Sequence, residues 1–155
     1  RMARIPEEYQ AVMRTAFRIL AYRDNTERVL RRKLTERKYS EEEIDFALRY
    51  VVHNGYLDEE KQLYHAIRRL ADGKLYGKRR VLQELYRLGF SQETLRHAVE
   101  EGCFDGIDFI ANCTEALRRA GGVCDPRTVA ALGRRGFSYS DIRAAQNALD
   151  TEQSL

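Results

Sequence analysis

The sequence predicts an all-α protein built from three tandem three-helix repeats of the helix-turn-helix type, and three observations support this prediction. Apolar residues recur at helical spacing along nearly the whole chain, and no stretch shows the sustained alternation of a strand. Only two prolines occur among 155 residues, so long segments are free to be helical. A short residue pattern also appears three times at similar intervals.

The first three expected helices span residues 7–22, 25–36 and 41–53. Val12, Ala16 and Ile19 give the first its apolar face, because their spacing places them on one side of a helix. Ser40 followed by Glu43 is the pattern of a capping box, in which each side chain bonds the other residue's backbone N–H. This pair therefore predicts the start of the third helix.

The next three expected helices span residues 59–72, 78–88 and 92–101. Asp58 precedes two glutamates, and carboxylates favour a helix N-terminus. Gly89 is expected to end the fifth helix and Gly102 the sixth, since glycine adopts the left-handed conformation that follows many helices. Ser91 is expected to cap the sixth helix.

The last three expected helices span residues 106–120, 126–135 and 139–150. Asp125 and Pro126 suit the cap and the first position of the eighth helix, where the missing proline N–H costs nothing. Gly136 is expected to end it, and Ser140 to cap the ninth helix.

The repeated pattern is a leucine, an aromatic residue five positions later, a serine directly after it, and an aliphatic residue four positions further on. Its copies are Leu34-Tyr39-Ser40-Ile44, Leu85-Phe90-Ser91-Leu95 and Leu132-Phe137-Ser138-Ile142. We interpret each copy as a corner between the second and third helices of a repeat. Phe90 and Phe137 should be buried there, as should Tyr39 apart from its hydroxyl. Lys38 stands where the other two copies have glycine.

The repeats predict three domains, at residues 1–54, 55–103 and 104–155, the last including a C-terminal tail. A three-helix unit also invites a DNA-binding interpretation. The corner residues do not decide this question, because they are packing residues in either case.

Composition and motifs favour neither a membrane-spanning protein nor an enzyme. The chain carries 27 Lys and Arg against 24 Asp and Glu, a net charge of +3, and no apolar run long enough to span a membrane. An enzyme is not expected, because no Ser/His/Asp ordering and no phosphate-cradling glycine loop is present. The acidic runs at 41–43 and 58–60 fit helix starts instead.

The cysteines and histidines indicate neither a disulfide framework nor a metal site. Cys103, Cys113 and Cys124 form an odd set without a C-x-x-C pair, so we expect reduced thiols and a cytoplasmic protein. The three histidines are scattered, and no metal or other cofactor is expected.

Two basic clusters stand out in the N-terminal and central parts of the chain. The first lies on the expected second helix and comprises Arg28, Arg31, Arg32, Lys33, Arg37 and Lys38. A solvated helix face near a C-terminus explains it as well as a binding surface does.

The second basic cluster comprises Arg68, Arg69, Lys74, Lys78, Arg79 and Arg80. Its last three residues open a helix, where positive charge opposes the helix dipole. We interpret charges so placed as contacts for an external anionic partner, either phosphate oxygens or an acidic protein surface. Tyr76, between cations of this cluster, is expected to be exposed and available for stacking on bases.

Four fragments in order resemble the RecX regulators of the RecA recombinase. They are Ile19–Asp24 with Leu30–Leu34, then Gly55–Asp58, then Tyr76-Gly77 with Val81–Leu85 and Gly89-Phe90, and finally Arg134–Ser138. The resemblance covers about residues 12–150. The third repeat departs from the family pattern, because its first helix lacks the usual lysines and its link reads Gly121-Gly122-Val123-Cys124.

The resemblance implies an elongated, curved chain of three repeats that binds along the RecA–DNA filament. It implies a monomeric bacterial regulator that inhibits RecA ATPase and strand exchange in recombination and DNA repair, and that makes weak contacts with single- and double-stranded DNA. The expected contact residues are those of the two clusters other than Arg37 and Lys38, together with Tyr76, Arg134 and Arg135. The alternative is a DNA-binding helical module without RecA specificity.

Overall fold

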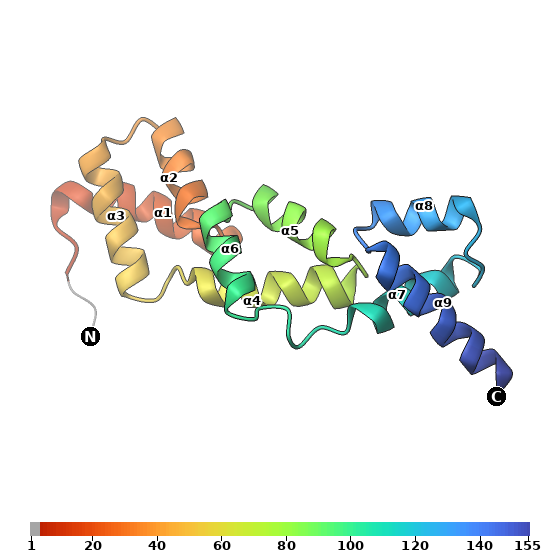
Figure 1. Cartoon of the computed structure of the whole chain (residues 1–155). Coiled ribbons are helices and arrows are strands. Elements are labelled where there is room, and N and C mark those ends of the chain that lie inside the picture. The colour runs from red at the N-terminus through yellow and green to blue at the C-terminus, as the bar shows by residue number, and fades with distance from the viewer. Residues whose placement is uncertain (1–3) are drawn as a thin grey trace. The chain divides into compact units, whose positions relative to one another are not determined.

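The computed structural model describes residues 4–155, and all regular structure in that part of the chain is helical (Figure 1). This confirms the predicted all-α class. The chain forms two compact bodies. The N-terminal body comprises Arg1–Leu63 and Leu88–Phe90, and the C-terminal body comprises Tyr64–Arg87 and Ser91–Leu155. Domain boundaries at 54 and 103 stay a prediction.

The N-terminal body begins with a 3₁₀ turn at Glu7–Tyr9, where an α-helix was expected. It continues with α1 (Gln10–Tyr22), α2 (Glu27–Glu36) and α3 (Glu41–His53). The three helices bury one apolar core, whose most enclosed side chains are Val12, Ala16, Leu30, Leu34, Ala47 and Val51. Their spacing along each helix matches the apolar faces expected from the sequence.

The fourth helix, α4 (Glu59–Arg68), ends four residues earlier than predicted and passes into a π-helical turn at Arg69–Gly73. The C-terminal body then contains α5 (Lys78–Arg87), α6 (Gln92–Glu100), α7 (Phe109–Arg119), α8 (Pro126–Arg134) and α9 (Tyr139–Ser154). Its most enclosed side chains include Val81, Leu85, Cys113, Leu117, Leu132 and Ala145. The α7 helix starts later than expected because Asp108 caps it at the amide of Ala111.

Side-chain caps set most of the helix starts. The capping box of Ser40 and Glu43 is present in full, and Ser91 accepts from the amide of Thr94. The assignment of Ser140 as the α9 cap was wrong. Ser138 caps α9 instead, because its hydroxyl accepts from the amide of Asp141. The helix therefore begins at Tyr139, two residues earlier than a cap at Ser140 would place it.

The three corners have the predicted backbone conformation. Gly89 and Gly136 have φ of +111° and +97°, and Lys38 takes the same left-handed region at φ +68°. Phe90 and Phe137 are buried as expected. Tyr39 is half-buried and packs against the core of the N-terminal body, and its hydroxyl lies 2.6 Å from the Thr15 hydroxyl.

Each of the last two corners contacts the start of the middle helix one repeat earlier. In the N-terminal body, Thr26 at the start of α2 donates its hydroxyl to the carbonyl of Gly89 at 3.4 Å. In the C-terminal body, Gly77 at the start of α5 donates its amide to the carbonyl of Arg135 at 2.8 Å. We call each of these contacts a joint.

An amide side chain reinforces each joint from the fourth residue of a first helix. Gln62 of α4 donates to the carbonyl of Asn25, which follows α1, at 2.9 Å. Asn112 of α7 donates to the carbonyl of Ala71 and to the carboxylate of Asp72, in the turn that follows α4. The tandem repeat is therefore visible in its connections as well as in its corners.

Candidate functional site

The first basic cluster lies on α2 and directly after it, and most of its side chains are engaged within the N-terminal body. Arg31 forms an ion pair with Asp45 of α3 at 2.8 Å, and Arg32 pairs with Glu36 at 3.3 Å. Both pairs are solvent-exposed, so each contributes little to stability. This cluster has the character of the solvated helix face that the sequence also allowed.

Lys33 has a structural role in the N-terminal body. Its ammonium donates to the side-chain oxygen of Asn25 at 2.5 Å, and Asn25 is buried. Burial, and then the neighbouring charge of Arg23, lower the pKa of Lys33. Since the backbone carbonyl of Asn25 also accepts from Gln62, Lys33 supports the joint.

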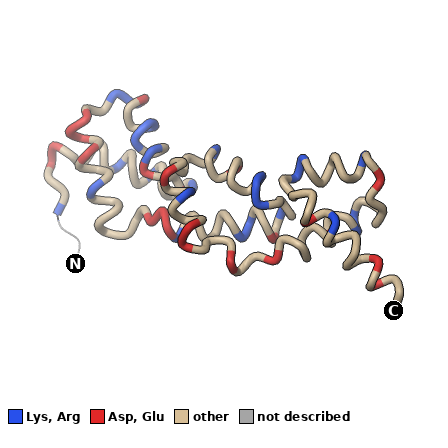
Figure 2. The backbone as a smooth tube through the Cα atoms, in the orientation of Figure 1, with Lys and Arg blue, Asp and Glu red and all other residues tan. Residues whose placement is uncertain are grey.

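The second basic cluster meets the third corner, although some 55 residues separate them in sequence. A Cβ on Gly77 would overlap the backbone of Gly136, and a Cβ on Gly136 would overlap the backbone of Arg80. The start of α5 and the end of α8 therefore approach each other backbone to backbone, as Figure 2 shows for their adjoining blue segments.

Arginine side chains from both segments bind backbone carbonyls across this joint. Arg79 donates to the carbonyl of Gly133, and Arg80 donates to that of Arg134 at 3.3 Å. Arg135 donates in return to the carbonyls of Lys74 and Leu75. The carbonyls at a helix C-terminus carry partial negative charge, so the end of α8 supplies an anionic partner inside the chain.

The sequence argument from charge opposing a helix dipole is therefore incomplete. Arg79 and Arg80 do lie at the N-terminus of α5, but the C-terminus of α8 and the carboxylate of Glu84, 3.2 Å from Arg80, compensate them. An arginine side chain has five N–H donors, and each carbonyl takes only one or two of them. The remaining donors can still bind an oxyanion.

Tyr76 is not the exposed stacking platform that the sequence predicted. Its ring is half-buried and lies between two guanidinium groups, with Arg80 at 4.5 Å and Arg135 at 5.2 Å from its centroid. These cation–π contacts hold the two arginines at the joint. Tyr76 thus stabilises the arrangement of the cations.

Four cations at the joint are exposed, namely Lys74, Lys78, Arg79 and Arg134. Lys78 lies 5.7 Å from the ring centroids of Phe104 and Phe109. Within residues 4–155, the side chains of Lys74 and Arg134 make no hydrogen bond or ion pair. Together with the arginines at the joint they form one basic surface, which we call the joint surface. It is defined by Lys74, Lys78, Arg79, Arg80, Arg134 and Arg135.

The remaining predicted contacts lie elsewhere. Arg68 pairs with Asp72 at 3.2 Å and donates to the carbonyl of Gly106, whereas Arg69 is exposed. Arg28 is exposed on α2 and has an interaction within the chain.

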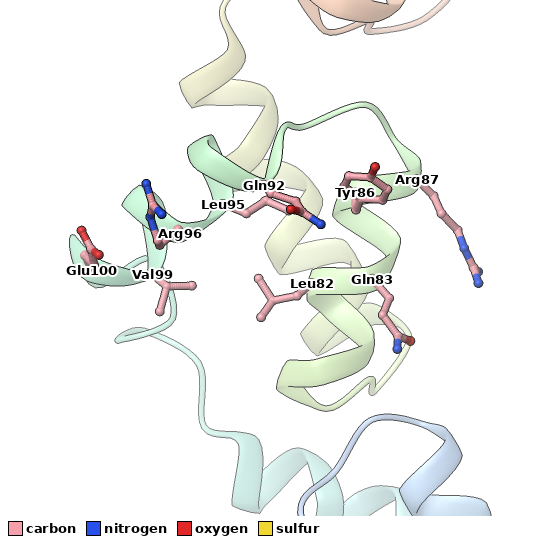
Figure 3. A pocket seen from close by; sticks show the side chains of 9 residues that line it. All are labelled: Leu82, Gln83, Tyr86, Arg87, Gln92, Leu95, Arg96, Val99 and Glu100. Carbon is pink, nitrogen blue, oxygen red and sulfur yellow. The ribbon is translucent and has the colours of Figure 1, made fainter.

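The sequence did not predict an apolar groove of about 630 Å³ in the C-terminal body. Its walls are α5 and α6, and Figure 3 shows Leu82 and Val99 facing each other across it. Val99 and Tyr86 on its rim are each more than two-fifths exposed. Its only signal in the sequence is that Leu82, Tyr86 and Val99 fall outside the repeated corner pattern.

Groups that could support other chemistry are scarce in residues 4–155. No cluster of His, Cys, Asp and Glu there is arranged to hold a metal ion. The three cysteines are free, and burial raises the pKa of the Cys113 thiol to about 12. Within the described residues, none of the helices combines the length and apolar character needed to cross a bilayer.

The chain is similar to known proteins over most of its length. The family model described as RecX, first three-helix domain, matches residues 13–50. The regulatory protein RecX of Vibrio vulnificus is 31% identical over 137 residues, covering 84% of this chain and 88% of that protein. RecX of Pseudomonas putida is 32% identical over 136 residues, covering 85% and 86%. RecX of Halorhodospira halophila is 29% identical over 151 residues, covering 92% and 91%.

Proposed function

Because this chain belongs to the RecX family of regulatory proteins, we propose that it regulates the RecA recombinase by binding the RecA–DNA filament. In this proposal it inhibits ATP hydrolysis and strand exchange through binding, without catalysing a reaction itself. The observation that supports the proposal is similarity to RecX proteins along most of their length.

The joint surface is the contact that we propose for this filament. It gathers six cations from two distant segments, and Glu84 is the one carboxylate that pairs with any of them in the described residues. A filament of nucleic acid and protein presents phosphates and carboxylates in a regular array. Such a polyanion attracts a concentrated basic surface.

The test measures RecA ATPase on single-stranded DNA while this protein is added in substoichiometric amounts. We expect the rate to fall as the protein is added. No change in the ATPase rate with folded protein would contradict the proposal. If DNA binding persisted without that change, the alternative of a general DNA-binding module would be favoured.

The contact residues are tested by charge reversal at positions that do not hold the joint. Lys74→Glu with Arg134→Glu should leave helicity unchanged and weaken inhibition, because both side chains are exposed. Arg96→Glu with Arg127→Glu is the matched control, since it changes the net charge equally at two other exposed positions of the C-terminal body. Equal loss in both variants would indicate that only net charge matters, and would contradict the joint surface as the contact.

A further inference from the structure

The groove between α5 and α6 is apolar at its centre, and it shares no residue with the joint surface. Leu82 of α5 and Val99 of α6 face each other across about 630 Å³ of space, and the buried Leu95 also lines it (Figure 3). Val99 leaves 42% of its surface in solvent. Because covering apolar surface is favourable in water, this groove favours an apolar occupant.

The equivalent space of the first repeat is bridged by charged side chains. The corner copies offset the first two repeats by 51 residues, so Leu82 and Arg96 correspond to Arg31 and Asp45. In the N-terminal body Arg31 and Asp45 form an ion pair at 2.8 Å, which joins α2 to α3. A leucine and an arginine cannot form such a pair, so the middle repeat keeps this space open.

The position of Val99 also differs among the repeats. The first repeat has Leu48 there, which is buried, and the third has Gln146. The side-chain oxygen of Gln146 accepts from the amide of Cys124 at 2.9 Å. A purely structural role does not account for an exposed valine here, because covered or polar side chains occupy the same position in the other two repeats.

Two opposite charges lie on the α6 wall of the groove (Figure 3). Arg96 and Glu100 are exposed and one turn apart, and within residues 4–155 neither side chain makes an ion pair or a hydrogen bond. On the α5 wall, Arg87 is already paired with Glu84 at 2.7 Å. The α6 wall therefore offers one cation and one carboxylate to an occupant of complementary charge.

The size and the walls of the groove favour a single helix as its occupant. Nine residues line the groove, whereas a stable interface between two folded proteins uses about 20–30 residues on each side, so the groove is too small to hold a second copy of this chain. An extended peptide pairs with an exposed strand edge, but all regular structure in residues 4–155 is helical. A groove between two helices accepts the apolar ridge of a third helix.

We propose that this groove binds one amphipathic helix of another protein. The apolar face of that helix, with residues at i, i+3, i+4 and i+7, packs between Leu82 and Val99. A carboxylate beside that face pairs with Arg96, which sets the position of the helix along the groove. This interaction goes beyond the proposed contact with the filament, because it uses a different surface and a different kind of partner.

The test measures binding of a fluorescently labelled synthetic peptide to the full chain in the absence of RecA. The peptide has about 16 residues, which is long enough for a helix, with leucines at the helical spacing given above and one glutamate beside them. A second peptide has the same composition but scrambled leucines. We expect the protein to bind the first peptide and not the second. Equal binding of both peptides, or binding of neither, would overturn the proposal.

Two variants place residues of the other repeats in the groove and should therefore leave the fold intact. Val99→Gln introduces the residue of the third repeat, and Leu82→Arg with Arg96→Asp introduces the ion pair of the first. Each should weaken peptide binding about tenfold at unchanged helicity, because an apolar contact at the centre of the site is lost.

Ile110→Gln is the matched control for Val99→Gln. Ile110 is 43% exposed, lies on α7 in the same body, and does not line the groove. We expect this variant to bind the peptide like the wild type. Equal losses in the two glutamine variants would contradict the groove as the binding site.

The charge contact is tested by exchanging the two charges. Arg96→Glu should weaken binding of the peptide about threefold, which is the typical contribution of an exposed ion pair. A peptide with lysine in place of its glutamate should regain binding to this variant and bind the wild type less well. If this reversal is absent, the pairing with Arg96 is wrong.

Two further outcomes concern the occupant and the proposed function. Self-association of the protein alone, measured by sedimentation equilibrium and abolished by Val99→Gln, would identify a second copy as the occupant and overturn the inference. If the protein leaves RecA ATPase unchanged but binds the peptide through Val99, the proposed function fails and this inference holds. If it inhibits the ATPase but Val99→Gln binds the peptide as the wild type does, the inference is wrong and the proposed function stands.

Discussion

Substituting Gly136 by alanine tests the close backbone contact at the joint in the C-terminal body. The added methyl group would meet two obstacles. The backbone φ of +97° disfavours a side chain, and the Cβ would overlap the backbone of Arg80. Relief of this steric overlap requires the start of α5 and the third corner to move apart.

The expected cost follows from these two obstacles. The left-handed conformation costs about 1–2 kcal/mol in alanine. Separation weakens the hydrogen bonds across this joint, and the loss of three of them, Gly77 to Arg135, Arg80 to Arg134 and Arg135 to Leu75, costs about 1 kcal/mol net each, while the long side chains of Arg79 and Arg135 can follow their other carbonyl partners. The total of about 4 kcal/mol would lower the thermal midpoint of a chain this size by about 8–16 °C.

Three other glycines of the same body separate the two contributions. Gly77 has the steric overlap without a left-handed φ, and Gly121 has φ of +108° with open space around its Cβ position. Gly133, inside α8, has neither obstacle. The alanine variants should therefore lose about 3 kcal/mol at Gly77 and about 1 at Gly121. Gly133→Ala should gain about 0.5–1 kcal/mol, because alanine is the better helix former.

The assay is thermal and urea denaturation of each variant, followed by far-ultraviolet circular dichroism. The order of stability should be Gly133→Ala, then Gly121→Ala, then Gly77→Ala, with Gly136→Ala lowest. If Gly77→Ala were as stable as Gly133→Ala, the backbones would not approach as closely as we describe. If Gly121→Ala and Gly136→Ala lost the same amount, conformation alone would explain the effect.

The other predictions concern the corners, a helix cap and a buried thiol. Phe90→Ala should lower the free energy of unfolding by about 3–5 kcal/mol because the ring is buried; an unchanged thermal midpoint would refute its role in the corner. Thr26→Val should cost about 1 kcal/mol, since the hydroxyl both caps α2 and binds Gly89, whereas Thr26→Ser should keep most of that stability in urea titrations. The raised pKa of Cys113 implies stability that is fully present below pH 9.0 and is lost as pH rises through about 12. Cys113→Ala should therefore show a shallower alkaline loss of stability than the wild type, and an identical loss would contradict this assignment.

The sequence by itself determined the helices, the corners and the triplication. These features depend on interactions between residues a few positions apart: the capping box of Ser40 and Glu43, the left-handed glycine at 89, and the apolar face of α1. Local patterns encode local geometry directly, which is why the ends of most helices fell within a few residues of their predicted positions. Ser140 was wrong because two serines compete within three residues of the same helix start.

The tertiary structure decided which cations have partners and which tyrosine side chains are exposed to solvent. Arg79 and Arg80 find helix-terminal carbonyls some 54 residues away, a contact that no local pattern reports. The same contact covers Tyr76, whereas Tyr64 stays exposed because its own helix buries the opposite face. Charge and aromatic content are written in the sequence, but the environment of each side chain depends on segments that only folding brings together.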